Sequence, residues 1–306
     1  MVMTVFAALT LGFAVGPILW LGRARIRGWR ELAGAVAAVG TATGSALLVG
    51  TWALLSVYLR PAILLALGGV LIAAVYRAIR SAPDAKWADI SGHRRTWQYG
   101  TAFFFAIVLA DAGAGRVAPP GTMDLRFPLE PGKYAVLQGG NSLVLNSFHH
   151  WFPSDRLALD IVKLNAFGSR AESLAPANLT GYAIFNAAVQ SPCSGTVELV
   201  EDDLPDNPPG VMDWEHPPGN HVLLRCGAVR ILLAHLRGGS VVVAAGEKIE
   251  AGQPVGRVGN SGNTREPHLH IGAETAESPR KAKPVPLSFE GRFLSVNDIV
   301  DAAPRE

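Results

Sequence analysis

One stretch decides how this chain is interpreted: Gly-Arg-Val-Gly-Asn-Ser-Gly-Asn at residues 256–263, followed by Pro-His-Leu-His at residues 267–270. His268 and His270 alternate with the apolar Leu269 and Ile271, a pattern typical of a β-strand with one face in the core. Residues two apart point to the same side of a strand. Both imidazoles can therefore serve one metal ion and the reaction zone beside it.

Three further elements add metal-ligating side chains elsewhere in the chain. They are His235 in Ala-His-Leu (234–236), the adjacent pair His149 and His150, and Asp160 in Ala-Leu-Asp-Ile (158–161). A lone His-x-His is weak evidence, but five of the eight histidines fall in this constellation. One carboxylate and several imidazoles are enough for a zinc site with an open coordination position.

The order His…Asp…His…His-x-His, with a Gly-Asn-Ser-Gly turn before the last element, resembles the lysostaphin-type (LytM-like) zinc endopeptidases that cut bacterial cell-wall peptides. The resemblance covers about residues 136–274. It includes the stretches Ser-Pro-Cys-Ser-Gly-Thr-Val (191–197), Gly-Asn-His-Val-Leu-Leu (219–224) and Gly-Glu-Lys-Ile-Glu-Ala-Gly-Gln (246–253). It implies a Zn²⁺ cofactor and hydrolysis of peptide bonds in peptidoglycan cross-links.

The resemblance also implies roles for individual residues. The family's zinc ligands are its first histidine, its aspartate and the second histidine of His-x-His. The last two become Asp160 and His270 here. His235 and His268 would lie beside the attacking water, as general base or as a group that stabilises the oxyanion.

The first ligand departs from the common family pattern. Many members place a histidine four residues before the aspartate, where this chain has Arg156. His149 and His150 match a variant with a longer interval, so either could be the ligand. If they lay in a strand they would face opposite ways, and only one could point inward. We favour His149 and leave His150 open.

The composition is apolar, with 49% hydrophobic and 17% charged residues, and nearly all of the excess lies before residue 115. Four apolar segments, at about 4–21, 32–59, 61–76 and 97–110, predict transmembrane helices, since about 20 apolar residues span a bilayer. The third and fourth are short, and buried soluble helices are the alternative for them. The first lacks the basic start of a cleavable signal peptide.

Basic residues set the expected topology. They cluster in two of the intervening loops: Arg23, Arg25, Arg27 and Arg30 after the first segment, and Arg77, Arg80, Lys86, Arg94 and Arg95 after the third. Positively charged loops stay cytoplasmic. The pattern predicts four crossings of a bacterial cytoplasmic membrane, with the N-terminus and the C-terminal domain outside.

Short strands with turn signals follow the helices and predict an all-β antiparallel domain. The expected organisation is a transmembrane helical region at 1–111, a Gly- and Pro-rich linker at 112–124 and the peptidase β-domain at 125–306. Strands are expected at 134–138, 196–200, 221–225, 229–236 and 241–244. A long acidic and proline-rich loop at 201–219 is interpreted as a surface loop or as a wall of the substrate groove.

The two cysteines, Cys193 and Cys226, lack CxxC spacing, so a thiolate zinc site is not expected. They flank two successive strands that would bring them together if the strands pair antiparallel. Outside the cytoplasm they would form a disulfide; the alternative is two inert buried thiols.

Three functions are compatible with these features. The first is a membrane-anchored zinc endopeptidase, with peptidoglycan peptides as substrate and the lipid bilayer as a partner. The second is a catalytically inactive relative that binds and activates another cell-wall hydrolase. A transporter or sensor is disfavoured because the helices lack buried charges. The net charge of +2, with no basic run interleaved with aromatics, excludes nucleic acid as the expected partner.

Overall fold

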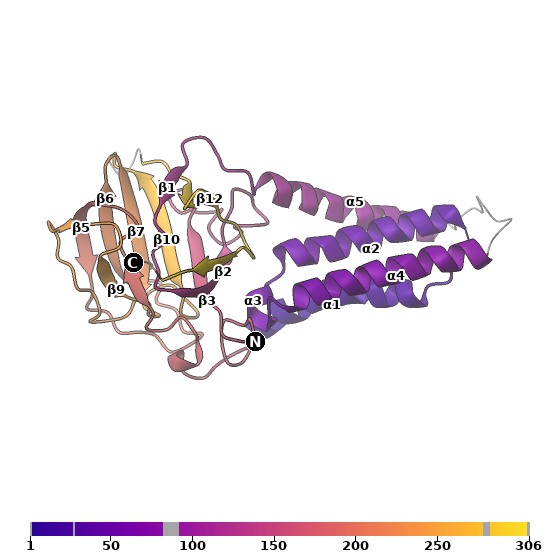
Figure 1. Ribbon diagram of the computed structural model, residues 1–306, viewed down its shortest axis with the longest axis horizontal. Coiled ribbons are helices and arrows are strands. Elements are labelled where there is room, and N and C mark those ends of the chain that lie inside the picture. Colours follow the sequence, from indigo (N-terminus) through magenta and orange to yellow (C-terminus); the bar gives the residue numbers. More distant parts are fainter. Residues whose placement is uncertain (1, 27, 82–91, 278–281, 305–306) are drawn as a thin grey trace. The chain divides into compact units, whose positions relative to one another are not determined.

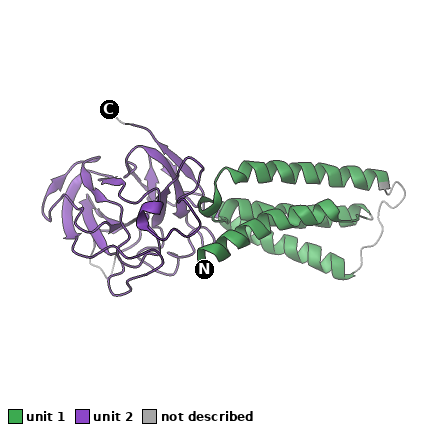
Figure 2. Cartoon of the chain, turned by 90° about the horizontal axis from the view of Figure 1, so that it is seen from below, with its two compact units in different colours: residues 1–113 green, residues 114–306 purple. Residues whose placement is uncertain are grey.

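A computed structural model of the chain describes residues 2–26, 28–81, 92–277 and 282–304. Two compact units divide the chain, Met1–Gly113 and Ala114–Glu306 (Figure 2). Of the basic residues used to predict the topology, Arg27 and Lys86 lie outside the described residues.

The first unit is helical (Figure 1). Its described elements are α1 (Val2–Arg23), α2 (Trp29–Val49), the short α3 (Trp52–Leu55), α4 (Leu59–Ser81) and α5 (Gly92–Ala114). In the part of the chain that the structure describes, α1, α2 and the Leu59–Arg80 part of α4 are long and apolar enough to cross a membrane. The predicted helical region is confirmed, and α5, the fourth predicted crossing, is helical without being among those three spans.

The second predicted segment, 32–59, is too long at its C-terminal end. Helix α2 stops at Val49 because Gly50 takes an extended conformation, with its N–H bonded to the carbonyl of Ala46. The Trp52 indole donates to the same carbonyl at 2.9 Å. The chain then turns through α3, and the next long helix starts at Leu59. Hydropathy alone does not detect this break, because the turn is apolar as well.

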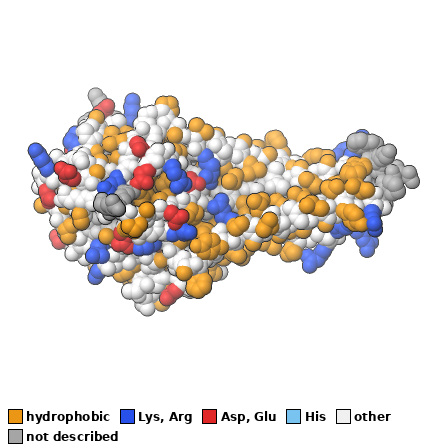
Figure 3. All heavy atoms as spheres, in the orientation of Figure 1, with side chains coloured by type: hydrophobic (Ala, Val, Ile, Leu, Met, Phe, Trp, Pro, Cys, Tyr) orange, Lys and Arg blue, Asp and Glu red, His pale blue; other side chains and the backbone are white. Residues whose placement is uncertain are grey.

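The helices expose apolar side chains and gather basic ones toward one end (Figure 3). Leu65 and Ile72 of α4 expose 77% and 73% of their surface, as expected of side chains that face lipid rather than water. At the end of α1, Arg77 donates to the carbonyls of Leu21 and Gly22 at 2.9 and 2.7 Å. The C-termini of α1 and α4 are therefore neighbours, and the basic residues Arg23 and Arg77 lie at the same end of the bundle.

The second unit is built from short strands (Figure 1). They are β1 (Met123–Leu125), β2 (Gly132–Gln138), β3 (Leu159–Lys163), β4 (Ala188–Gln190), β5 (Gly195–Glu201), β6 (Asn220–Cys226), β7 (Val229–Leu236), β8 (Lys248–Ile249), β9 (Pro254–Arg257), β10 (Leu269–Thr275), β11 (Leu287–Phe289), β12 (Arg292–Phe293) and β13 (Ile299–Ala302). Among the described residues, eight strands form one antiparallel sheet in the order β13-β2-β3-β10-β7-β6-β5-β8. The predicted antiparallel β-domain is confirmed, and β1 with β11 forms a parallel pair outside this sheet.

The register of the sheet separates the core face from the polar face. Leu269 pairs with Ile161, and both are fully buried in the hydrophobic core. The next pair along the same strands is His270 opposite Asp160. Because neighbours in a strand alternate between faces, this pair lies on the opposite side of the sheet.

The expected strand at 241–244 is not formed. Asp202 accepts the backbone N–H groups of Ser240 and Val241 at 3.2 Å each. A side chain thus takes hydrogen bonds that a strand neighbour would otherwise satisfy. Val242, 68% exposed, is not a core residue.

The expected disulfide is confirmed, since Cys193 and Cys226 are bonded with their Cα atoms 6.2 Å apart. Strands β5 and β6 pair antiparallel, with Thr196 opposite Arg225. The residue that precedes the first strand therefore lies beside the end of the second. The bridge closes the base of the β5–β6 connection.

Candidate metal centre

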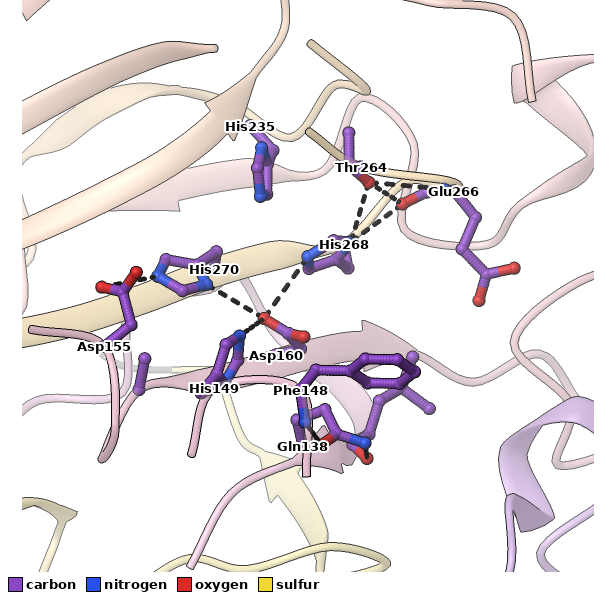
Figure 4. Close-up of polar contacts among 12 residues, drawn as sticks. Gln138, Phe148, His149, Asp155, Asp160, His235, Thr264, Glu266, His268 and His270 are labelled. Atoms are coloured by element: carbon purple, nitrogen blue, oxygen red, sulfur yellow. Dashed lines mark hydrogen bonds and ion pairs between the residues drawn. The ribbon is translucent and has the colours of Figure 1, made fainter. Parts of the chain in front are cut away.

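Three side chains converge on the polar face of the central strands (Figure 4). His149, Asp160 and His270 each offer one ligand atom, and these atoms all lie within 4.8 Å of one another. The Oδ1 atom of Asp160 lies 3.4 Å from His149 Nε2 and 3.1 Å from His270 Nδ1. One carboxylate oxygen is thus shared by two imidazoles.

Three adjacent strands carry three of the residues expected at the site, and a fourth directly precedes one of them. Strand β10 lies between β3, which carries Asp160, and β7, which carries His235. His268, directly before β10, and His270 point to the same side, as the i, i+2 spacing predicts. The Nε2 atom of His268 is 3.4 Å from Asp160 Oδ1, and its ring centroid is 4.8 Å from that of His235.

His149 comes from a turn-rich segment, residues 141–157, instead of a strand. The alternation argument that applies to strands therefore does not apply to the pair 149–150. His149 is buried, and its ring lies 4.9 Å from that of His270. His150 is half-buried beside Trp151 and is outside the group of converging ligand atoms among the described residues.

Asn146 orients the ring of His149. Its Nδ2 atom donates to the carbonyls of Arg156 and Ala158 at 3.1 and 2.9 Å, which fixes the amide orientation. Its Oδ1 is then the acceptor for the Nδ1–H of His149 at 2.9 Å. The lone pair of His149 is therefore on Nε2, the atom that faces Asp160. The sequence alone does not assign Asn146 a role, since an asparagine three residues before a histidine carries no distinctive signal.

His235 sits in an irregular part of β7. The pairing of β6 with β7 shifts register between Asn220 and Val222, a β-bulge, and His235 has a left-handed φ of 60°. Such backbone is costly for a residue other than glycine and is concentrated at functional sites. The carbonyl of Ser261 accepts a hydrogen bond from His235 Nδ1 at 2.9 Å, so Nε2 is left as the basic nitrogen.

His268 is held from the side away from Asp160. Its Nδ1 donates to the carbonyl of Glu266 at 2.8 Å, and the Thr264 hydroxyl lies 3.2 Å away. The Glu266 carboxylate in turn forms a buried two-point ion pair with Arg170, at 2.7 and 2.6 Å. The turn before β10 is thus fixed by buried polar contacts.

The electrostatics of the metal-free site give the histidines different tendencies. Burial opposes ionisation of Asp160, but His149 and His268 outweigh it and hold the pKa of that carboxyl well below its usual range. Burial lowers the pKa of His149 and of His268, yet the attraction of Asp160 gives both a raised pKa. Burial, together with His268 and His270, holds the pKa of His235 well below its usual value. His235 is therefore the neutral imidazole of the group.

The donor set fits zinc. Bonds of about 2.0–2.2 Å in a tetrahedral site separate neighbouring ligand atoms by about 3.3–3.5 Å. The separations from Asp160 Oδ1, 3.4 Å to His149 and 3.1 Å to His270, are close to that. Two imidazoles and one carboxylate with no thiolate are typical of a catalytic zinc site with three protein ligands.

The acidic loop is tied to the glycine-rich turn beside the site. Backbone N–H groups of Asn207, Gly210 and Asp213 donate to the carbonyls of residues 260, 265 and 262 at 3.0, 2.7 and 3.0 Å. Gly219 has a positive φ of 59°, and a Cβ there would collide with the carbonyl of Ser261. This close approach explains why a glycine directly precedes β6 and why another, Gly262, faces it in the turn.

One family model matches the part of the chain that carries three of these histidines. Residues 180–282, about a third of the chain, match the model of peptidase family M23. That range contains His235, His268 and His270 and begins after His149 and Asp160. A comparison with curated protein sequences gave no match.

Several solved structures are similar to part of this chain. Lysostaphin in solution is 19% identical, with 41% of this chain and 39% of lysostaphin covered and a TM-score of 0.27. A putative peptidase M23 from Pseudomonas aeruginosa is 16% identical, with 56% and 54% covered and a TM-score of 0.29. A zinc-containing peptidase from Vibrio cholerae is 17% identical, with 49% and 50% covered and a TM-score of 0.24.

The matches span about two-fifths to a half of these relatives. The family assignment rests on the sequence match at residues 180–282 and on the residues that it contains. Within the β-domain, residues 180–282 are similar to peptidase family M23, the family of the LytM-like peptidases.

Proposed function

We propose that the protein is a membrane-anchored zinc endopeptidase that hydrolyses peptide bonds of peptidoglycan cross-links outside the cytoplasm. One observation carries the proposal: His149, Asp160 and His270 converge as ligands, and two more imidazoles, His235 and His268, flank them. A site that only binds a partner needs no second pair of buried histidines. The family match supports a peptidase in general, and the donor set supports zinc.

The proposed roles follow from the orientation of each side chain. A zinc ion held by His149 Nε2, Asp160 and His270 Nδ1 would supply a Lewis acid that polarises the scissile carbonyl and promotes ionisation of water. Asn146 keeps the lone pair of His149 on the ligating nitrogen. Such outer contacts fix the tautomer and the ring orientation of a metal-binding histidine.

The two remaining imidazoles divide the proton chemistry. His235 is neutral, with Nδ1–H held by Ser261, so its Nε2 accepts a proton from the attacking water. His268 donates Nδ1–H to the carbonyl of Glu266, and its Nε2 faces the site. A proton on that nitrogen would be donated to the oxygen on which negative charge develops.

The chemistry is tested on the full chain. Purified protein is analysed for zinc and incubated with isolated peptidoglycan, and new amino termini are identified by mass spectrometry. We expect about one zinc per chain, hydrolysis that stops with a chelator and recovery when zinc is restored. Zinc-loaded, folded protein that releases no new amino termini would contradict the enzyme and favour the inactive regulator.

The membrane anchor is tested separately. The exposed apolar faces of α1, α2 and α4 support it, and Arg23 and Arg77 at one end of the bundle support a cytoplasmic location for that end. Topology reporters fused after residue 90 and after residue 120 should report opposite sides of the membrane. The same side for both would refute four crossings.

A further inference from the structure

An exposed apolar cluster lies on the segment that carries His149. Leu143, Phe148, Trp151 and Phe152 expose 41, 58, 72 and 56% of their surface. We call residues 143–152 the aromatic segment. Single exposed apolar residues are normal on a soluble protein, but a contiguous group of large ones marks an interaction surface.

The base of the aromatic segment is fastened to the chain that leaves α5. The carbonyl of Gly115, the residue after the helix, accepts the N–H of Asn141 at 2.7 Å. A Cβ at Gly115 would collide with Ser142, so the two backbones pack directly against each other. Arg116 is held as well, by an ion pair with Asp298 at 2.9 Å.

Helix α5 is the fourth predicted crossing, and its apolar part ends close to this contact. Phe103, Phe104 and Ile107 expose 71, 61 and 54% of their surface, and the polar Asp111 follows. Gly115 is four residues beyond Asp111, about 6 Å along a helix. The headgroup zone on each side of the hydrocarbon core is about 5–7 Å thick. If α5 crosses, Gly115 and the segment packed on it lie at the membrane surface.

We infer that the aromatic segment inserts Phe148, Trp151 and Phe152 into the interfacial zone of the leaflet in which α5 ends. The side-chain chemistry fits a bilayer, because tryptophan is enriched at membrane interfaces and phenylalanine serves as an apolar anchor there. The inference rests on the membrane anchor in the proposed function. Since His149 is on the same segment, membrane insertion would link this zinc ligand to the bilayer contact.

The test places single spin labels on the full chain in phosphatidylethanolamine–phosphatidylglycerol vesicles. The two natural cysteines form a disulfide, so an added cysteine is the reactive thiol. Labels go on Trp151→Cys and, as a second position, Phe152→Cys. Val242→Cys, 68% exposed on the same unit, is the aqueous control, and Leu65→Cys on α4 is the membrane-embedded reference.

We expect the labels at 151 and 152 to collide several-fold more with oxygen, relative to a water-soluble nickel complex, than the label at 242. If both behave like 242 while 65 is embedded, the inference is overturned and the anchor stands. If the label at 65 is aqueous, the anchor fails and the inference fails with it. If 151 is aqueous until peptidoglycan fragments immobilise it, the segment contacts substrate and the inference is wrong. Zinc content measured on the same samples reports the metal site independently.

Discussion

The two sides of the candidate metal centre are built in different ways. Asp160, His268 and His270 are positioned by the register of β3 and β10, where one pairing places His270 opposite Asp160. His149 is positioned by a turn-rich segment, in which the buried amide of Asn146 bonds both the backbone and the ring of His149. A strand side chain is placed by many backbone hydrogen bonds, whereas a loop side chain needs its own polar support.

The match to the family model covers only part of the centre. It begins at residue 180, so it contains His268 and His270 and omits both Asp160 and His149. Only the folded sheet brings residue 149 next to residue 270. The following predictions test the strand-borne and the loop-borne parts of the centre, in order of decreasing expected effect on hydrolysis.

Removing a strand-borne ligand should have the largest effect. In Asp160→Ala and His270→Ala, zinc should fall from about one per chain to near zero and hydrolysis to background, because two ligands are too few for a zinc site. Elemental analysis and the peptidoglycan assay measure both. His216→Ala, at an exposed histidine paired with Asp213, is the control and should keep its zinc. Full zinc retention in both ligand variants would disprove the site.

Removing a flanking imidazole should separate turnover from metal binding. His235→Ala and His268→Ala should lower turnover by roughly 10²–10⁴-fold, the usual contribution of a general acid or base, while most zinc stays bound. Turnover and zinc content are measured on the same preparations. Zinc loss in His268→Ala as complete as in His270→Ala would mean that the roles within His-x-His are reversed.

Removing the side chain that supports His149, the loop-borne ligand, should have an intermediate effect on hydrolysis. Asn146→Ala frees the ring of His149 and should weaken zinc affinity by about 10–100-fold, as for other outer contacts of metal-binding histidines. Competition with a chromogenic chelator measures the affinity. Asn178→Ala, at an exposed asparagine outside the segment, is the matched control. Equal zinc affinity in the two variants would show that Asn146 does not support His149.

Zinc affinity should also depend on pH. The raised pKa of His149 means that a proton competes with the metal, so affinity should fall about tenfold per pH unit below that pKa. In metal-free protein, His149 and His268 make the fold more stable at lower pH, whereas zinc affinity falls at lower pH. The raised pKa values of His149 and His268 stabilise the fold below about pH 6.5, and this is lost as pH rises through them. His235 acts in the opposite direction, because its pKa is held below the usual value and its contribution to stability grows as pH rises. Melting of metal-free His235→Ala protein should therefore shift to lower temperature between about pH 6 and pH 8; an unchanged or rising midpoint would contradict the electrostatic assignment.

Removing the disulfide should have the smallest effect on hydrolysis. It lies at the end of β6 where β6 meets Val229, whereas His235 lies at the other end of β7. Replacing Cys193 and Cys226 by serine should lower the free energy of unfolding by about 3–4 kcal/mol. Denaturant unfolding measures this loss, and turnover per folded molecule should stay within about twofold. A large drop in turnover with unchanged stability would contradict a purely structural bridge.

Periodicity and spacing predicted much of this protein because they reflect regular structure. The i, i+2 histidines, the apolar segments and the pairing of the strands that carry the cysteines follow from helix and strand geometry. The end of α2, the bulge at His235 and the support from Asn146 could not be predicted. Each depends on a local contact between residues whose types are common: Gly50 with Ala46, His235 with Ser261, and Asn146 with Ala158.

The central claim is that a histidine on a loop, and not its neighbour in sequence, completes the zinc site. Zinc content of His149→Ala and His150→Ala, purified side by side as full chains, tests it most directly. The structure predicts near-zero zinc for His149→Ala and about one zinc per chain for His150→Ala. Zinc retained in His149→Ala and lost in His150→Ala would contradict the account.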